Sequence, residues 1–274
     1  MYLGIDIGGT KTIVAILDDN GVIQESYKFP TAKTYDKFLN DLAIFVDKLS
    51  TKEFVTAAAG VPGRLDRTHG IAMAFGNRPW RNVPIQKDIE KIIGCKLAIE
   101  NDANLAGLSE AMLAKEYSRV LYVTVSTGIG VGFIVNQHLD PGMVDSEGGN
   151  ILLEHNGKLE PWEDFASGRA IVSRFGKRAK DITDNKTWRI IAHNLAIGLI
   201  DLIAVMQPEM IILGGGVGTY YAKYKEYLDK DLKEYENPLL NTPIIREAAR
   251  PELAVVYGCY DIIKSNYEAN TEKN

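Results

Sequence analysis

Apolar and polar positions alternate along the chain with two different periods, one typical of strands and the other of helices. Near the N-terminus, YLGIDI (2–7), KTIVAILDD (11–19) and VIQESYKF (22–29) read as three strands, with a turn at Asn20–Gly21 between the last two. Residues 35–49 then place an apolar stripe on one side of a helix, formed by Phe38, Leu42, Phe45, Val46 and Leu49. Strand-like and helix-like segments keep alternating toward the C-terminus, which predicts an α/β fold.

The later segments continue this pattern. Strands are predicted at VTAAAGV (55–61), CKLAIE (95–100), RVLYVTVS (119–126), VGFIVN (131–136) and EMIILGGG (209–216). Helices are predicted over 103–115, 187–206, 219–235 and 251–267, and 268–274 reads as a frayed tail. The stretch DSEGGNILLEHNGKLEPWEDFASG (145–168) has neither period, so a metal site, a substrate-binding arm and a solvated loop all remain possible for it.

One internal repeat indicates two lobes. YLGIDIGGTKTIVAILDDNG (2–21) and LYVTVSTGIGVGFIVNQHLDPG (121–142) both run from an apolar strand through a glycine-rich turn into a second apolar strand. We therefore expect a duplicated fold whose halves face each other across a cleft. The expected boundaries are a small N-terminal α/β lobe at 1–115, on which the last helix packs back, and a large C-terminal α/β lobe at 116–250.

The first glycine-rich turn has the composition of a phosphate-binding loop, with Gly8, Gly9, Thr10 and Lys11 in succession. Glycine permits positive φ and lets a ligand approach the backbone closely, and successive N–H groups form a nest for an anion. Asp6, at the end of the preceding strand, could hold a magnesium ion through water, because magnesium keeps much of its hydration. The alternative is a tight hairpin with an Asp cap.

Two further glycine clusters follow strands in the second half, at STGIGVG (126–132) and GGGVG (214–218). The second of these could admit a flat purine against bare backbone. None of the three clusters fits GxxxxGK[ST], and 214–218 also fails GxGxxG because Thr219 stands where the last glycine should be. Neither a Walker ATPase nor a Rossmann dehydrogenase is supported.

A candidate general base lies in ENDAN (100–104), between a strand and a helix. Asp102 could accept a proton from a substrate hydroxyl that is hydrogen-bonded to it while phosphorus is attacked. The alternative is that this carboxylate is only the N-cap of the helix, a position that Asn and Asp favour. Leu105 leaves a capping box from Asp102 without its Glu or Gln.

Composition narrows the class of protein. A chain of 274 residues suffices for one large domain or two ordinary ones, and its net charge of −5 disfavours a nucleic-acid partner. LAIGLIDLIAVM (195–206) is shorter than the roughly 18 apolar residues of a membrane span and is broken by Asp201. Two cysteines, Cys95 and Cys259, are too few for a disulfide framework. These features predict a soluble cytoplasmic protein.

Taken together, the motifs resemble the ROK family of sugar kinases and repressors within the actin/hexokinase-like superfamily. The resemblance runs from Tyr2 to the last helix and rests on DIGGTK (6–11), GVPGRLD (60–66), GNRPWRNVPI (76–85), ENDANLAGLSEA (100–111), STGIGVG (126–132), WEDFASGRA (162–170) and PEMIILGGGV (208–217). It implies a two-lobed actin/hexokinase-like (ribonuclease H-like) α/β fold with duplicated β-hairpin phosphate turns. Family repressors carry an N-terminal helix-turn-helix, and the phosphate turn begins here at residue 6, which favours the kinases.

The resemblance also implies roles for residues. Asp102 matches the base that takes the proton from the sugar 6-hydroxyl, and Asn101 and Asn77 match residues that hydrogen-bond the sugar ring, with Gly63 in the same set. ATP would be bound by three turns, containing Gly8, Gly9, Thr10 and Lys11, then Ser126, Thr127 and Gly128, then Gly214, Gly215 and Gly216. Magnesium would accompany ATP at Asp6.

The stretch 145–168 departs from the family pattern. ROK kinases usually hold a structural zinc with one His and three Cys, but Asn150 stands in place of that His and GKLEPWE (157–163) contains no Cys. Tetrahedral zinc with thiolate ligands is therefore not expected here. Glu147 and Glu163 match the two glutamates that contact the sugar, and Asn150 joins them as a substrate-binding candidate that alters preference near C1 and C2.

The remaining polar residues of this stretch match no functional position. We expect His155 to be solvated or locally bonded and Glu154 and Glu160 to be solvated charges. As a hypothesis, Trp162, Phe165 and Leu159 pack under the loop and replace metal coordination by apolar burial.

The sequence therefore predicts an ATP- and Mg²⁺-dependent hexose 6-kinase without zinc, with glucose as the first candidate substrate. Alternatives in the same class are N-acetylmannosamine, N-acetylglucosamine, mannose, fructose or β-glucoside kinases, and polyphosphate could replace ATP. The alternative of another class is a non-catalytic sugar sensor. Family resemblance implies a homodimer, with no membrane or nucleic-acid partner.

Overall fold

The chain divides into two compact units in the computed structural model, which describes residues 1–76 and 78–271 (the backbone alone from 266 onward). Unit 1 comprises Met1–Met112 and the chain from Glu252, and unit 2 comprises Leu113–Pro251. The two units are of nearly equal length, whereas the sequence suggested a small and a large lobe.

Unit 1 is built on a five-stranded sheet of order β3-β2-β1-β4-β8. Its strands are β1 (Tyr2–Ile7), β2 (Lys11–Leu17), β3 (Ile23–Pro30), β4 (Ala57–Val61) and β8 (Leu97–Asn101). Neighbours among the first three are antiparallel, whereas β1, β4 and β8 run parallel. Since parallel strands end at the same edge of a sheet, Asp6, Gly60 and Glu100 come into register there.

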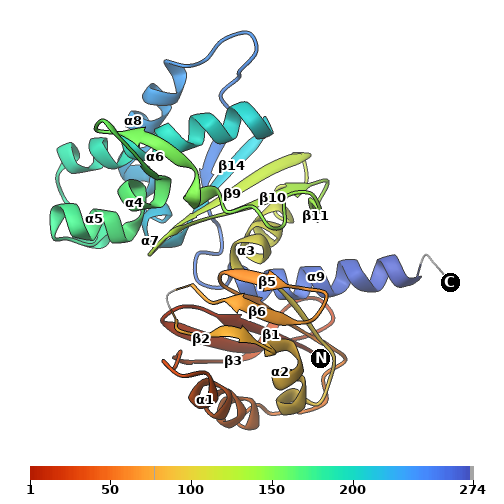
Figure 1. Cartoon of the computed structure of the whole chain (residues 1–274). Coiled ribbons are helices and arrows are strands. Elements are labelled where there is room, and N and C mark those ends of the chain that lie inside the picture. Colours follow the sequence, from red (N-terminus) through yellow and green to blue (C-terminus); the bar gives the residue numbers. More distant parts are fainter. Residues whose placement is uncertain (77, 272–274) are drawn as a thin grey trace. The chain divides into compact units, whose positions relative to one another are not determined.

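Helices cover both faces of this sheet (Figure 1). Helices α1 (Tyr35–Asp47) and α2 (Ile85–Ile93) bury their apolar stripes on one face, and α3 (Asp102–Ala111) and α9 (Ala254–Thr271) pack on the other. A strand covered on both faces must be apolar on both, which explains the nearly continuous apolar run of β1.

Helix α9 packs closely on α3 because Gly258 has no side chain. A Cβ at position 258 would lie 2.0 Å from the carbonyl oxygen of Leu105. The predicted last helix therefore exists, but it begins at Ala254 rather than 251 and continues to Thr271, beyond the expected end at 267. The last three residues of the predicted tail lie outside the described residues.

Two parts of unit 1 were not predicted from the sequence. One is helix α2, and the other is a small antiparallel sheet of β5 (Arg64–Asp66), β6 (Ile71–Ala74) and β7 (Arg81–Val83). These strands have three or four residues each, which is too short for an alternating pattern to be read.

Unit 2 repeats the plan of unit 1 with the sheet order β11-β10-β9-β14-β15. Its strands are β9 (Arg119–Val125), β10 (Ile129–Val135), β11 (His138–Leu139), β14 (Met210–Gly214) and β15 (Ile244–Glu247). As β1 does, β9 pairs with the next strand in a hairpin and with a later strand in parallel. The duplicated hairpin predicted from the sequence is confirmed.

Helix α6 (Asn185–Met206) forms the centre of the unit 2 core, against α8 (Tyr221–Lys233) and the inner face of the sheet. By length and composition α6 could cross a membrane, but 50% of its most apolar window is buried inside the unit. Trp188, Leu195 and Leu199 are among its fully or nearly fully buried residues. A buried core helix of this kind passes the same test of length and hydropathy.

The stretch without a clear period folds into short elements. Residues 148–166 form the 3₁₀ turn η1 (Gly148–Asn150), the hairpin of β12 (Leu152–His155) and β13 (Lys158–Pro161), and helix α4 (Trp162–Ala166). Helix α5 (Gly168–Phe175), the turn η2 (Ala179–Asp181) and, after β14, the short helix α7 (Gly215–Gly218) complete the unit. We call residues 147–168 the arm.

Candidate active site

The carboxyl ends of β1, β4 and β8 bring two carboxylates of unit 1 together. Asp6 ends β1, and Asp102 directly follows β8 at the start of α3. Gly60 of β4 lies between them, and a Cβ there would stand 3.6 Å from the Cα of Asp102. Burial, and then the charge of Asp102, raise the pKa of Asp6 to about 7, while Lys11 lowers it.

The first glycine turn is closed by backbone hydrogen bonds. The Gly8 N–H donates to the carbonyl of Lys11 at 2.9 Å, and the Thr31 hydroxyl donates to the carbonyl of Gly8 at 2.7 Å. A Cβ at Gly8 would lie 2.8 Å from the Lys11 oxygen, whereas neither Gly8 nor Gly9 has positive φ. Glycine is thus required at 8 by the close approach of the Lys11 carbonyl and not by positive φ.

Lys11 has a partner inside unit 1. Its Nζ lies 3.7 Å from Oε1 of Glu252, whose other oxygen lies 3.4 Å from Lys28 Nζ. Burial, and then the neighbouring Lys28, lower the pKa of Lys11. Anionic phosphate oxygens at this turn would therefore compete with Glu252 for the Lys11 ammonium group.

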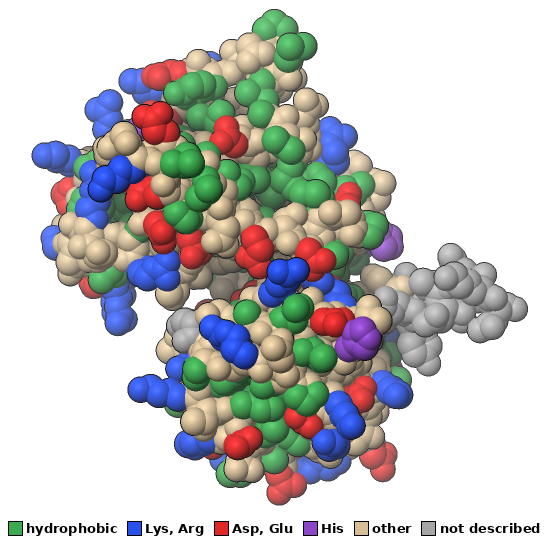
Figure 2. All heavy atoms as spheres, in the orientation of Figure 1, with side chains coloured by type: hydrophobic (Ala, Val, Ile, Leu, Met, Phe, Trp, Pro, Cys, Tyr) green, Lys and Arg blue, Asp and Glu red, His purple; other side chains and the backbone are tan. Residues whose placement is uncertain are grey.

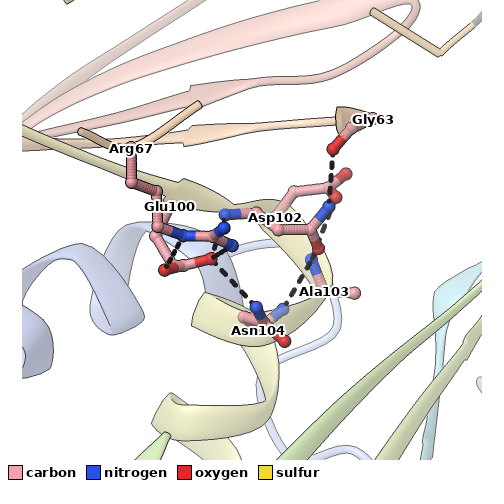
Figure 3. A network of polar contacts seen from close by, with 7 residues as sticks. Gly63, Arg67, Glu100, Asp102, Ala103 and Asn104 are labelled. Atoms are coloured by element: carbon pink, nitrogen blue, oxygen red, sulfur yellow. Dashed lines mark hydrogen bonds and ion pairs between the residues drawn. The ribbon is translucent and has the colours of Figure 1, made fainter. Parts of the chain in front are cut away.

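A buried carboxylate, Glu100, anchors the loop that carries Asp102 (Figure 3). Arg67 binds it through two nitrogens, with the Nε–Oε2 distance at 2.7 Å. The backbone N–H of Asn101 and the side-chain amide of Asn104 donate to Oε1 at 2.6 and 2.9 Å. One carboxylate thus joins the turn after β5, the end of β8 and the first turn of α3.

The N-cap of α3 is Asn101, not Asp102. The Asn101 side-chain oxygen accepts from the N–H groups of Ala103 and Asn104, and its amide nitrogen donates to the Gly63 carbonyl at 3.3 Å. Asp102 is the first helical residue, and its Oδ1 accepts from the Ala103 N–H. Asp102 is therefore not the N-cap of α3, because the neighbouring Asn101 side chain fulfils that role.

Two other residues of unit 1, Gly63 and Asn77, were predicted to contact the sugar. Gly63 has φ of +95°, and a Cβ there would lie 2.2 Å from the Ala74 carbonyl, so only glycine fits. The Gly63 carbonyl oxygen accepts a hydrogen bond from the Asn101 side-chain amide. Asn77 lies outside the described residues.

In unit 2 the second and third glycine turns lie side by side, because Gly214 of β14 pairs with Thr124 of β9. Gly215 has φ of +78°, and a Cβ there would stand 2.6 Å from the Val125 carbonyl. A Cβ at Gly216, by contrast, would meet nothing within 4 Å. The third turn thus packs on the end of β9, directly before the second turn, and its backbone at Gly216 is open to a ligand.

The second turn also touches the arm. Gly168 N–H donates to the Ser126 carbonyl at 2.7 Å, and Oε2 of Glu163 accepts from the Ile129 N–H at 3.1 Å. Gly128 leaves room for that oxygen, because a Cβ there would lie 2.4 Å from it and the Glu163 side chain would have to shift. Of the other two residues in this turn, Ser126 closes it with its N–H on the Gly128 carbonyl, and Thr127 is exposed.

The three predicted sugar contacts of the arm lie near one another. Turn η1 packs against β10 and α4, and the Trp162 N–H donates to the carbonyl of Ile151. Glu147 and Asn150 are exposed at the ends of η1. Glu163 is less free than expected, since its second oxygen lies 3.3 Å from Arg169 Nη2.

Two expectations for the arm need correction. Leu159 is 69% exposed and does not pack under the loop, whereas Trp162 and Phe165 are buried as expected. Glu160 is not a solvated charge, because its Oε1 lies 2.6 Å from Nδ1 of His155. For His155, local bonding rather than solvation is the outcome, with 15% of its side chain exposed.

The side chains of the arm do not fit a structural zinc. In the described part of the chain, no group of three or more His, Cys, Asp or Glu side chains is placed to hold a metal ion. Both cysteines belong to unit 1, and burial raises the pKa of the Cys259 thiol to about 12. The arm therefore offers no thiolate, and its order must come from other contacts.

The sequence did not point to Arg67 or Arg169. Arg67 lies in the turn after β5 and pairs with Glu100, which is distant in sequence. Arg169 lies in the short helix α5 and pairs with Glu163 and Asp164 of α4. Glu100 carried a weak signal, since it stands at the end of a buried strand directly before Asn101 and Asp102. Figure 2 shows acidic and basic side chains intermixed over the visible face of each unit, as expected for a small negative net charge.

Known proteins share the sequence pattern and the fold of this chain. The profile of the ROK family matches residues 2–265. A glucokinase from Streptomyces coelicolor is 28% identical over 261 residues, covering 79% of this chain and 82% of the relative. An N-acetyl-D-glucosamine kinase from Haemophilus influenzae is 29% identical over 297 residues, covering 94% and 97%.

Among solved structures, a ROK family glucokinase from Streptomyces griseus in complex with glucose and AMPPNP superimposes with a TM-score of 0.82. It is 24% identical, and the match covers 95% of this chain and 98% of that one. The expected actin/hexokinase-like fold is thereby confirmed. With a family profile that spans almost every described residue and the same fold, the chain belongs to the ROK family.

Proposed function

We propose that this protein transfers the terminal phosphoryl group of ATP to the 6-hydroxyl of a hexose, with glucose as the first candidate. The relatives named above are kinases of different sugars, and the chain is an ATP-dependent sugar kinase. The identity of the hexose, the roles of individual residues, a cytoplasmic location and a homodimeric state belong to the proposal.

The observation that carries the proposal is the setting of Asp102. Its carboxylate stands at the first position of α3, is not needed as the N-cap, and lies within the electrostatic field of Asp6. As the 6-hydroxyl oxygen attacks the γ-phosphorus, its proton passes to Asp102, the new O–P bond forms, and the bond to the bridging oxygen of ADP breaks.

Binding of ATP is supported by the three glycine turns. The N–H groups of Gly8 and Ser126 close the first and second turns, and we propose that the rest of the backbone at 8–11 and 126–128 binds phosphate oxygens. The open backbone at Gly216 suits the nucleoside. Carboxylate oxygen is a ligand that magnesium favours, so Asp6 fits the metal that accompanies ATP. When bound, that ion neutralises charge on the phosphates.

Sugar binding is proposed for Asn101 in unit 1 and for Glu147, Asn150 and Glu163 in the arm, with Asn77 as a further candidate. Carboxylates accept hydrogen bonds from vicinal hydroxyls, and an amide both donates and accepts. Because Asn150 replaces the family histidine, a hexose with a substituent at C2 is a direct rival of glucose.

A coupled assay of ADP release over a panel of hexoses tests the proposal. The panel contains glucose, mannose, fructose, N-acetylglucosamine, N-acetylmannosamine and a β-glucoside, each with ATP or polyphosphate as donor. We expect sugar-dependent ADP release with glucose at the highest kcat/KM. Sugar binding by calorimetry without any phosphoryl transfer would instead identify a non-catalytic sensor, and preference for another sugar would correct the substrate alone.

A further inference from the structure

The hairpin of the arm presents two unlike faces. Side chains alternate along a strand, so the pairs Leu153–Glu160 and His155–Lys158 share one face of the β12–β13 hairpin. The opposite face carries Leu152 and Leu159, which are 57% and 69% exposed. Leu153, at 7% exposed, and the partly buried His155 and Glu160 therefore form the inner face.

A histidine on this inner face connects three segments of the arm. Nδ1 of His155 lies 2.6 Å from Oε1 of Glu160 on the neighbouring strand, and its ring stacks on that of Phe165, with centroids 4.2 Å apart and planes at 11°. The side-chain amide of Asn156 stands 3.1 Å from Nε2. If that amide donates to Nε2, the ring proton is on Nδ1 and is donated to Glu160.

Helix α4 is held from its other side by α6. The Trp162 indole donates to the Asn194 carbonyl at 3.0 Å, and the Asn194 amide donates to the Phe165 carbonyl at 2.9 Å. Gly198 makes room for the indole, because a Cβ there would lie 2.2 Å from the ring. Phe165 is thus fixed by α6 at its backbone and by His155 at its ring.

Contacts of this kind matter because α4 has only five residues. Helices shorter than about 12 residues are marginal on their own, so the position of α4 depends on what packs against it. Glu163 lies within α4, between Trp162 and Phe165, and its carboxylate reaches the backbone of the second glycine turn. Displacement of α4 would therefore displace this carboxylate.

We propose that the His155–Glu160 pair, stacked on Phe165, is a metal-free clasp that positions Glu163 for sugar binding. It takes the place in the arm where the family resemblance implies zinc, which the side chains present do not fit. His155 is on this view a positioning residue that never touches the substrate. The inference rests on the proposed function, because it assigns a sugar contact to Glu163.

The test uses His155→Ala, Glu160→Gln and the double variant. We expect His155→Ala to raise the KM for the sugar about tenfold, with kcat changed less than about threefold and the KM for ATP unchanged. The double variant should be no worse than His155→Ala, because the two residues act as one pair. His155→Gln keeps a donor and His155→Phe keeps the stack, so each should recover part of the loss.

His193→Ala is the matched control. His193 lies in the same unit and forms a similar pair, with Nδ1 3.0 Å from Oδ2 of Asp231, but this pair joins α6 to α8 rather than to α4. We expect it to leave both KM values unchanged. Equal effects of the two substitutions, or a lower melting temperature of His155→Ala with an unchanged sugar KM, would contradict the clasp.

Two measurements do not depend on turnover. Amide hydrogen exchange of residues 162–168 should become faster in His155→Ala and stay unchanged in His193→Ala. Elemental analysis of the purified protein should find no stoichiometric zinc, and finding it would overturn the inference. A wild-type protein inactive on every hexose would refute the proposed function instead, while the exchange experiment would still decide whether the clasp holds α4.

Discussion

At the scale of single residues, the surroundings of the two carboxylates at the end of the unit 1 sheet have opposite effects on negative charge. Asp6 is held at the edge of a sheet covered on both faces, and its raised pKa favours the protonated form near neutral pH. Asp102 sits at a helix start, where the dipole favours a negative charge. The charge of Asp102 contributes to the raised pKa of Asp6, so a cation bound between or beside the two carboxylates would favour the ionised form of Asp6.

Asp102→Asn should lower kcat by about 10³-fold, because general base catalysis contributes on the order of 10²–10⁴-fold. The KM for sugar should change little and the melting temperature should be kept, since the Asn101 side chain and not Asp102 caps α3. Steady-state kinetics and thermal unfolding measure both. Turnover within a factor of a few of the wild type would rule out Asp102 as the base.

The raised pKa of Asp6 makes stability depend on pH in a defined direction. The folded protein keeps the Asp6 proton up to about pH 7, whereas the unfolded chain loses it near its ordinary value of 3.8. Folding is therefore assisted below the lower value, and this contribution is lost as the pH rises through the window up to about 7.

Asp6→Asn should abolish this loss of folding stability at higher pH. In the absence of magnesium and nucleotide, the variant should melt at a higher temperature than the wild type at pH 8, and the difference should vanish at pH 4. The same variant should lose most of its activity, because it lacks the proposed magnesium ligand. Melting curves across pH 4–8 provide the check, and a gap that is constant with pH would contradict the assignment.

At the scale of elements, the loop before α3 is fixed by a buried ion pair rather than by the helix itself. Glu100 is 5% exposed and joins Arg67 to two backbone or amide N–H groups on the other side of the loop. Neutralising the Glu100 carboxylate weakens the hydrogen bonds from Arg67, the Asn101 N–H and the Asn104 amide at once, and hydrogen bonds to charged groups contribute about 1.5–3 kcal/mol each.

Glu100→Gln should therefore lower the free energy of unfolding by about 3 kcal/mol and reduce kcat/KM for the sugar. Arg67→Met added to Glu100→Gln should recover part of the stability, because it also removes the positive charge that faced the Glu100 carboxylate, but should not recover activity. Lys37→Met, which breaks the exposed Lys37–Asp41 pair of α1, is the control and should cost less than about 0.5 kcal/mol. Urea unfolding measures all three, and equal costs for Glu100→Gln and Lys37→Met would contradict the argument.

At the scale of the whole molecule, the candidate residues are divided between the two units. Unit 1 carries Asp6, the first glycine turn and Asp102, and unit 2 carries the other two turns and the arm. The chain passes between the units twice, after Met112 and before Glu252. The proposed reaction therefore assigns substrate-binding or catalytic residues to both units.

Ligand-dependent hydrogen exchange can test this division. A nonhydrolysable ATP analogue should slow exchange at 213–219 and at 8–12, and the sugar should slow it at 100–105 and within the arm. Helix α1 serves as the internal reference and should not respond to either ligand. Protection confined to one unit with both ligands present would contradict the assignment of binding residues to both units.

The longer strands, the long helices and the glycine turns were predictable from the sequence, because each depends on the pattern of neighbouring residues. YLGIDI has apolar side chains on both faces, a pattern that predicts a buried strand. The hairpins β1–β2 and β9–β10 both begin with a strand of this kind. The order of motifs sufficed for the family as well. The glycine turns and ENDAN follow strands whose carboxyl ends meet at one edge of the sheet in each unit.

Only the tertiary structure decided the contacts between segments distant in sequence. The Arg67–Glu100 pair, the packing of α9 on α3 at Gly258, and the position of Glu163 on the second turn each join residues more than 30 positions apart. In the arm, the elements are too short for a period to show, and their order comes from His155, Phe165 and Asn194. Local preference is weak in such short elements, so packing determines where the substrate-binding candidates lie.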